Sequence, residues 1–233
     1  MPTRPGWLGV LWRGLLVLAL LLLFWQLVLL TQVIWWSRFD PGSTSFMRMR
    51  LAELRESDPE ATLRHQWVDY ERISIHLKRA VVAAEDDRFL DHGGFDWTGI
   101  QRALERNEQR GRLAAGGSTI SQQLAKNLFL SPSKSWLRKG QEAVLTVMIE
   151  TTWDKRRILE VYLNVVEWGN GIFGAEAAAQ RYYGTSAANL GPAQAARLAV
   201  MLPNPRRYEH NYGPRLAAHA NRIQRRMQAS QVP

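Results

Sequence analysis

Three short segments of the sequence combine residue types that could carry chemistry on an anionic substrate. In the first, residues 80–96, a run of small apolar residues leads directly into Glu85, Asp86 and Asp87. Carboxylates that lie close together raise the pKa of one another, which moves a carboxyl group towards the range useful for a general base. The segment therefore predicts Glu85 as a candidate base at a helix end. A solvated acidic helix end is the alternative.

In the second segment, residues 116–129, Gly116 and Gly117 open onto a predicted helix. Thr119 and Gln122 have the spacing of a capping box, so free N–H groups at the helix start could receive an anion. The predicted buried positions of this helix are Ile120, Leu124 and Leu128. The polar positions on its other face are Gln123, Lys126 and Asn127. An ordinary glycine turn with a capped helix would produce the same pattern.

The third segment, from residue 137 onwards, places Arg138 and Lys139 four and three residues before Glu142. At these spacings the three charges share one side of a helix. A surface salt-bridge ladder, worth a few tenths of a kcal/mol, is the ordinary explanation. The predicted apolar face of the same helix comprises Leu137, Gln141, Val144, Leu145, Met148 and Ile149.

Several classes of site are excluded by composition. The absence of cysteine removes thiol nucleophiles, cysteine-ligated zinc, iron–sulfur clusters and disulfides. The five histidines show no H-E-x-x-H or similar spacing, so histidine-based metal catalysis is unsupported. Ser131 to Lys134 matches the S-x-x-K pattern of penicillin-binding transpeptidases, but no S-D-N or K-T-G follows, so we interpret the match as chance. No nucleotide-binding glycine motif is present.

The elements that must position these residues begin with an uncharged apolar run over residues 14–36. As a helix it would be about 34 Å long, enough to cross a hydrocarbon core of roughly 30 Å. Tryptophans flank it on both sides, as at membrane interfaces: Trp7, Trp12, Trp35 and Trp36. A buried core helix is a weaker alternative, and no small-residue cleavage site follows the run, as a signal peptide would require. We expect a membrane anchor.

Net charge points to an anionic partner. The chain of 233 residues carries +9, and 25 of its 30 basic residues are arginine, which suits bidentate contacts to phosphate or carboxylate. Only Arg4 and Arg13 precede the apolar run, so +7 belongs to the part after it. Basic residues also follow the run closely, so the positive-inside rule argues weakly against a domain outside the cytoplasm. Charge alone therefore leaves the orientation of the membrane span open.

The rest of the chain shows mostly helical periodicity, with glycine and proline at the connections. Helices are predicted over 46–56, 75–85, 97–109, 119–129, 137–151, 155–166, 174–183, 192–201 and 214–228, and a short extended piece over 65–73. The predicted organisation is a short cytoplasmic tail (1–13), a transmembrane anchor (14–36), a juxtamembrane hinge and helix (37–60) and one mainly α domain (61–233).

In order along the chain, these segments resemble the motifs of the peptidoglycan glycosyltransferases, which polymerise lipid II. E-D-x-x-F-x-x-H-x-G is matched from Glu85 to Gly94, and G-G-S-T-I-T-Q-Q from Gly116 to Gln123 with serine at position 121. R-K-x-x-E is Arg138, Lys139 and Glu142, and K-x-x-I-L-E-x-Y-L-N runs from Lys155 to Asn164. A fifth motif helix, 193–203, has Gln194 where an acid is common, so it receives no role. The resemblance covers residues 67–208.

The resemblance implies a lysozyme-like glycosyltransferase domain behind one N-terminal transmembrane helix. The implied reaction extends β-1,4 glycan strands from lipid II with inversion and release of undecaprenyl diphosphate. It implies that Glu85 is the general base and that Glu142 lies on the leaving-group side. The residues implied to bind the diphosphate are Ser118, Gln123, Lys126, Asn127, Arg138 and Lys139. Motif positions without an assigned role are Asp86, Phe89, His92, Gly116, Gly117, Thr119, Lys155, Glu160, Tyr162 and Asn164.

The resemblance also implies a setting. The chain is expected in the bacterial inner membrane as a single-pass protein with its catalytic domain in the periplasm, most similar to the monofunctional transglycosylases of Gram-negative bacteria. Expected partners are lipid II, the growing lipid-linked strand and membrane lipids, with other cell-wall synthesis or division proteins left open and nucleic acid not expected. No cofactor and no metal-ligating residue is expected, although a divalent cation, Mg²⁺ or Mn²⁺, could assist the diphosphate.

Two other classes of function compete with this one. A membrane-anchored lysozyme-like muramidase would also use acidic residues on a helical fold, but needs neither the glycine turn nor the basic cluster. A non-enzymatic binder of anionic polymer would suit the 214–228 helix with Arg215, Arg222, Arg225 and Arg226, for which we expect a solvated or lipid-facing basic face. A further hypothesis is an apolar lip that admits the lipid tail: Phe129, Leu130, Trp136 and Leu137.

Overall fold

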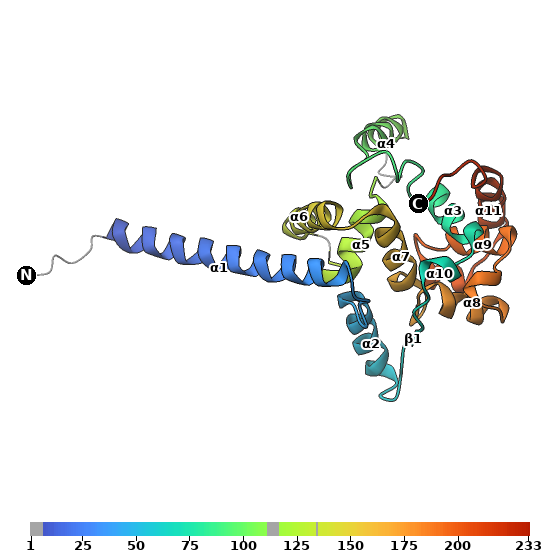
Figure 1. The fold of residues 1–233 in the computed structure, drawn as a ribbon, viewed down its shortest axis with the longest axis horizontal. Coiled ribbons are helices and arrows are strands. Elements are labelled where there is room, and N and C mark those ends of the chain that lie inside the picture. Colours follow the sequence, from blue (N-terminus) through green and yellow to red (C-terminus); the bar gives the residue numbers. More distant parts are fainter. Residues whose placement is uncertain (1–6, 111–116, 134) are drawn as a thin grey trace, which may run out of the picture.

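The computed structural model describes residues 7–110, 117–133 and 135–233, and its longest element is helix α1, Trp7–Trp36. Figure 1 shows α1 projecting away from the other helices. The most apolar 18-residue window of this 30-residue helix has a mean hydropathy of 2.5 and is only 6% buried, so α1 is not a core helix. Among the described residues it is the one helix long and apolar enough to cross a membrane. The helix is longer than the predicted anchor because residues 7–13 continue it.

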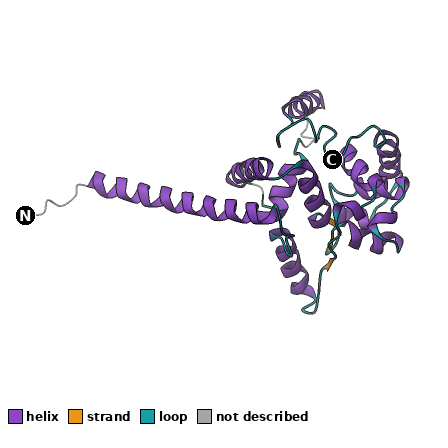
Figure 2. Ribbon diagram, viewed as in Figure 1, coloured by secondary structure: helices purple, strands orange, loops and turns teal. Residues whose placement is uncertain are grey.

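The rest of the described chain is built mainly from short helices (Figure 2). They are α2 (Ser45–Ser57), α3 (Ile75–Glu85), α4 (Trp97–Arg110), α5 (Ile120–Phe129), α6 (Trp136–Thr152), α7 (Lys155–Val165), α8 (Ala175–Tyr183), α9 (Pro192–Ala199), α10 (Pro205–His210) and α11 (Pro214–Arg226), with 3-10 turns at Tyr70–Arg72 and Ala187–Asn189. Side-chain caps fix several starts, including the predicted capping box of Thr119 and Gln122. The predicted helices are confirmed to within two residues at each end, whereas α10 was not predicted.

A small sheet accompanies the helices and was mostly missed by sequence. Its strands are β1 (Arg64–His65), β2 (Glu167–Gly169) and β3 (Ile172–Phe173), in the order β1-β3-β2. Strand β1 pairs parallel to β3, and β2 pairs antiparallel to it. The extended piece predicted over 65–73 is confirmed only at its start, because residues 70–72 form a 3-10 turn. Strands this short carry no alternating pattern that a sequence could reveal.

The core brings the chemically interesting segments together. Helix α5 packs against α6 and α7, and α3 packs against α9. The predicted stripe Ile120, Leu124 and Leu128 is buried in this core, as are most residues of α7. Because the ends of α3 and α5 are fixed by packing on their neighbours, Glu85 and the start of α5 are held in one place.

The last third of α1 is docked onto the domain. Leu29, Val33 and Trp36 are buried there. Trp153 donates its indole N–H to the carbonyl oxygen of Val33 at 2.9 Å. Gln26 and Gln141 of α6 exchange two amide hydrogen bonds, at 2.8 and 3.1 Å. Further along, the Arg157 guanidinium donates to the carbonyl oxygens of residues 36 and 39. The anchor is therefore joined to the domain by side-chain and backbone contacts, beyond its chain connection.

Asn164 ties α7 to the segment that carries β1. Its amide accepts from the backbone N–H of Val68 at 2.9 Å and donates to the carbonyl oxygens of Val68 and Glu160, both at 2.9 Å. Its own carbonyl oxygen lies 3.1 Å from Nε2 of His65. Asn164 is fully buried. Its role in this structure is to satisfy backbone groups that water cannot reach.

We expect Asn164→Ala to lower the free energy of unfolding by about 3 kcal/mol, because both backbone groups of Val68 lose their partner in a buried place. Denaturant unfolding of the detergent-solubilised chain, followed by tryptophan fluorescence, measures the change. Asn189→Ala, at an exposed position, is the control and should change little. Equal midpoints for both variants would contradict this account of Asn164.

Candidate active site

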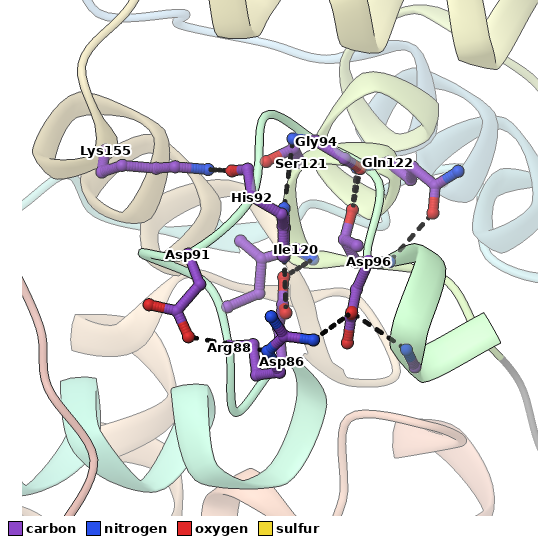
Figure 3. A network of polar contacts seen from close by, with 12 residues as sticks. Asp86, Arg88, Asp91, His92, Gly94, Asp96, Ile120, Ser121, Gln122 and Lys155 are labelled. Atoms are coloured by element: carbon purple, nitrogen blue, oxygen red, sulfur yellow. Dashed lines mark hydrogen bonds and ion pairs between the residues drawn. The ribbon is translucent and has the colours of Figure 1, made fainter. Parts of the chain in front are cut away.

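The site is built around the end of α3, where Asp86 follows Glu85 and leaves the helix. The buried Asp86 carboxylate accepts from Nε2 of His92 at 2.9 Å and from the backbone N–H of Ile120 at 3.0 Å (Figure 3). The other ring nitrogen of His92 accepts from the N–H of Gly94 at 3.1 Å, so Nε2 carries the proton. Asp86 thus joins the loop after α3 to the first turn of α5, where a negative charge is favoured.

The loop after α3 is also pressed against α6. Gly94 has φ of +91°, and a Cβ built there would lie 2.7 Å from Cγ2 of Thr146, so only glycine fits. Thr119 donates its hydroxyl to the Gly94 carbonyl oxygen at 2.7 Å. Figure 3 shows Lys155 reaching this loop from α7: its Nζ donates to the carbonyl oxygen of His92 at 2.6 Å. The loop is therefore held by contacts from the start of α5, from α6 and from α7.

A hydrogen-bonded chain orients Glu85. Tyr162, fully buried in α7, donates its hydroxyl to Oε1 of Gln123 at 2.9 Å. That contact turns the amide nitrogen of Gln123 towards Glu85, and Nε2 donates to the Glu85 carboxylate at 2.8 Å. Burial raises the pKa of Glu85, while the Gln123 hydrogen bond and the charge of Lys126 oppose the rise. Asp86 also raises the pKa of Glu85, as expected of a neighbouring carboxylate, but its contribution is the smallest and burial is the main cause.

A cluster of cations surrounds the second acid. Glu142 is only 3% exposed, and it pairs with Arg138 at 2.7 Å and with Lys139. Lys139 also reaches the hydroxyl of Ser118 at 3.3 Å. The surface ladder considered from sequence is therefore excluded, because the acid at its centre is buried. Nε of Arg138 is buried without a partner in the described part of the chain, so one N–H remains for a ligand.

Lys126 lies in the field of both acids. Burial lowers its pKa, and Arg138 and Lys139 lower it further, whereas Glu142 and, more weakly, Glu85 raise it. Among the described residues its ammonium has no hydrogen bond or ion pair. A desolvated cation without a fixed partner between two acids is suited to receive an anionic ligand.

Two cavities mark where a ligand could lie. One of about 130 Å³ is lined by Glu85, Asp86, Asp87, Asp96, Gly99, Gly117, Ser118 and Thr119. The other, of about 280 Å³, is lined by Ser135, Trp136, Arg138 and Lys139. The first has the candidate base in its wall, and the second has the cations. Since Lys139 also contacts Ser118, the two cavities adjoin one another.

The structure groups most, but not all, of the motif residues at this site. Gln123 and Lys126 interact with Glu85, whereas Phe89 is buried beneath the loop, with Nζ of Lys155 4.6 Å from its ring centroid. Gly117 lines the cavity, Asn127 is buried in α5, and Gly116 lies outside the described residues. Glu160 and Asn164 brace the segment near β1, where Glu160 accepts from the N–H of Tyr70 at 2.9 Å, and are not at the site.

Sequence reasoning missed Glu150. It accepts from Lys155 at 2.8 Å and from the hydroxyl of Ser121, and so joins α5, α6 and α7. Its spacing was a usable signal, because Glu142, Thr146 and Glu150 recur every four residues and form one polar face of α6. The predicted apolar face of α6 was partly wrong: Leu137 is 90% exposed and Val144 is exposed too.

Comparisons with known proteins identify the family of the chain. The family model described as Transglycosylase matches residues 51–228. A protein named biosynthetic peptidoglycan transglycosylase from Azoarcus sp. is 70% identical over 233 residues, covering all of both chains. Proteins of the same name from Aromatoleum aromaticum and Dechloromonas aromatica are 69% and 62% identical, covering 95% of this chain and 96% and 97% of their own lengths.

We expect Asp86→Ala to lower the free energy of unfolding by about 3 kcal/mol, because it removes a buried acceptor from His92 and Ile120. A double-mutant cycle with His92→Ala, measured by denaturant unfolding, should give a coupling of about 1 kcal/mol or more. Asp91→Ala, an exposed acid of the same loop, is the control and should stay within about 0.5 kcal/mol. Strictly additive effects of the Asp86 and His92 changes would show that the pair does not hold the loop.

Proposed function

Since the chain belongs to the peptidoglycan transglycosylase family and is a glycosyltransferase that makes glycan strands, we propose that it uses lipid II as substrate and Glu85 as general base. The observation that carries this proposal is the position of Glu85. Its carboxyl group is desolvated, oriented by Gln123 and separated from a cation cluster centred on Glu142. A base on one side can deprotonate the attacking hydroxyl, and cations on the other side can stabilise the anion that leaves.

The proposed reaction is a single displacement at an anomeric carbon. Glu85 removes the proton from the 4-hydroxyl of one lipid II, and that oxygen forms the new bond to the anomeric carbon of the lipid-linked strand. The bond from that carbon to the diphosphate oxygen breaks, and undecaprenyl diphosphate leaves with the bonding electron pair. One inversion converts the α-linked donor into a β-1,4 product. The raised pKa makes the Glu85 carboxylate a stronger base than an exposed glutamate.

The leaving diphosphate would meet Lys126, Arg138 and Lys139. Arg138 keeps one N–H without a partner, and the ammonium of Lys126 is unpaired among the described residues, so both can turn to the diphosphate. A protein-held divalent cation fits this donor set poorly. Both oxygens of Glu142 already accept from cations, and the described residues contain no group of three or more acids or histidines able to hold a metal. We therefore assign the charge stabilisation to the three side chains.

We place the domain on the periplasmic side, where the lipid-linked strand is extended. The apolar helix α1 supplies a single-pass anchor. Trp136 and Leu137, at the start of α6, are each 90% exposed next to the cavity lined by Arg138 and Lys139. These two side chains support an apolar lip for the lipid tail, whereas Phe129 and Leu130 pack against the core and are removed from that hypothesis.

The alternatives lose their support. A muramidase would need its second acid free for chemistry on a glycan, but Glu142 is buried and neutralised by two cations. A purely non-enzymatic role leaves the orientation and the raised pKa of Glu85 without a function.

We expect Glu85→Gln to reduce lipid II polymerisation by about 10³-fold or more, because a positioned base contributes roughly 10² to 10⁴. Purified chain is incubated with lipid II, and the glycan is analysed before and after muramidase digestion. Glu56→Gln, an exposed acid of α2, is the control. Because the pKa of Glu85 is higher in the folded state than in the unfolded state, the free energy of unfolding falls as the pH rises between these two values. At pH 7 Glu85→Gln should therefore be no less stable than the wild type. Full polymerisation by the variant, or cleavage of existing strands by the wild type, would refute the proposal.

Tyr162→Phe should leave the fold intact and lower kcat about fivefold, because one hydrogen bond worth about 1 kcal/mol no longer orients Gln123. Gln123 donates to the ionised form of Glu85 and lowers its pKa, so losing that orientation raises it. The acidic limb of the kcat/KM profile should therefore move to higher pH. Tyr182→Phe, which removes a hydroxyl bonded to the Trp168 carbonyl oxygen, is the matched control. An unmoved limb in Tyr162→Phe would exclude this role.

A further inference from the structure

A basic pocket lies between α10 and the start of α11. Its volume is about 670 Å³, within the range of small-molecule sites. Its charged and titratable lining residues are Arg207, Tyr208, Arg215, His219 and Arg222. No aspartate or glutamate lines it. The pocket therefore presents positive charge without a compensating acid in its wall.

The three arginines of the pocket are exposed and have no ion pair within the described residues. A second cavity near α3 and the C-terminus makes a useful contrast, because its Arg226 is paired with Asp87 at 2.8 Å. The positive charge also affects His219. Burial lowers the pKa of its ring, and the charges of Arg222 and Arg226 lower that pKa further. In this pocket the positive charge is thus left for a ligand.

The basic surface continues past the pocket. A cavity of about 420 Å³ shares Arg207 with it and is also lined by Arg206, His210, Asn170 and Asn204. Arg206 is paired with Glu53 at 3.1 Å, so it contributes less free charge. Arg207 lines both cavities, so its guanidinium can contact a ligand in either one. Two adjoining basic hollows suit an extended ligand that carries several acidic groups.

The position of the pocket argues against a lipid headgroup. Figure 1 shows α10 and α11 at the end of the molecule away from the free end of α1. Since we propose that α1 spans the membrane, α10 and α11 lie on the side of the domain away from the bilayer. Of the two alternatives expected for the 214–228 helix, a solvated or a lipid-facing basic face, this position favours the solvated one. Its anionic partner must come from the side of the protein opposite the membrane.

We propose that this pocket binds carboxylates of the peptide stems on peptidoglycan glycan strands. Guanidinium groups form paired hydrogen bonds with carboxylates, and three unpaired ones around a single hollow favour a ligand with more than one acidic group. The inference rests on the family's product, a stem-bearing glycan, and not on the roles proposed for Glu85 or Glu142. Bound stems would hold a strand at the far end of the enzyme while its lipid-linked end stays at the membrane.

The test is co-sedimentation of the full chain, in detergent, with isolated peptidoglycan sacculi. Two kinds of sacculi are compared: intact ones, and ones whose peptide stems have been removed by an amidase. Wild type should bind intact sacculi about tenfold more tightly than stripped ones, and the binding should weaken with salt as ionic screening increases. Arg215→Gln combined with Arg222→Gln should reduce binding to intact sacculi by about tenfold.

The matched control is Arg48→Gln combined with Arg225→Gln. It removes the same charge from exposed residues outside the pocket and should bind like wild type. Both double variants should polymerise lipid II within about twofold of wild type, since neither touches the site of Glu85. Equal loss in both double variants, equal binding to both kinds of sacculi, or no wild-type binding would overturn the proposal. So would a pocket-specific loss seen only with anionic lipid vesicles.

The two proposals fail separately. A wild-type protein that binds sacculi through the pocket but makes no polymer would remove the function proposed for Glu85 and leave the pocket standing. A protein that polymerises lipid II but binds sacculi independently of Arg215 and Arg222 would do the reverse.

Discussion

The catalytic region depends on one buried carboxylate, that of Asp86. It accepts from His92 and from the first N–H of α5, and so fixes the loop after α3 to the helix that carries Gln123. A buried charge is tolerated only while its partners remain, so this contact strongly favours one arrangement of the two segments. With α5 held in that register, Gln123 reaches Glu85 on one side and Tyr162 on the other. The orientation of the candidate base thus follows from the satisfaction of a neighbouring acid.

The site keeps its two glutamates in opposite electrostatic states. Burial raises the pKa of Glu85, and its one neutral donor, Gln123, only partly opposes the rise. Glu142 is buried as well, but two cations neutralise it. Lys126 stands between these environments with no fixed partner among the described residues. Burial alone does not decide what a carboxyl group can do, because its nearest donors determine whether it takes up a proton or anchors cations.

Much of the fold was predictable, because helical periodicity and caps are local signals. Helix α3 was predicted with the same bounds, and the capping box of Thr119 was visible in four residues. The sheet was not predictable, since its two- and three-residue strands carry no period. The site showed a similar division: spacing placed Arg138 beside Glu142, but the burial of Glu142 arises from distant segments packing together. The four-residue spacing of Glu150 placed it on the polar face of α6, but its partners in α5 and α7 could not be read from that spacing.

The docking of α1 makes the membrane part of the catalytic geometry. The Gln26 and Gln141 pair, the indole of Trp153 and the Arg157 guanidinium fasten the anchor along its last third. A free anchor could answer a thicker or thinner bilayer by tilting on its own. Here any tilt of α1 that relieves hydrophobic mismatch must carry the domain with it, and so changes the angle at which the two cavities of the candidate site meet the lipid surface. In the proposed membrane setting, a change in bilayer thickness would therefore alter the orientation of the whole domain through these contacts.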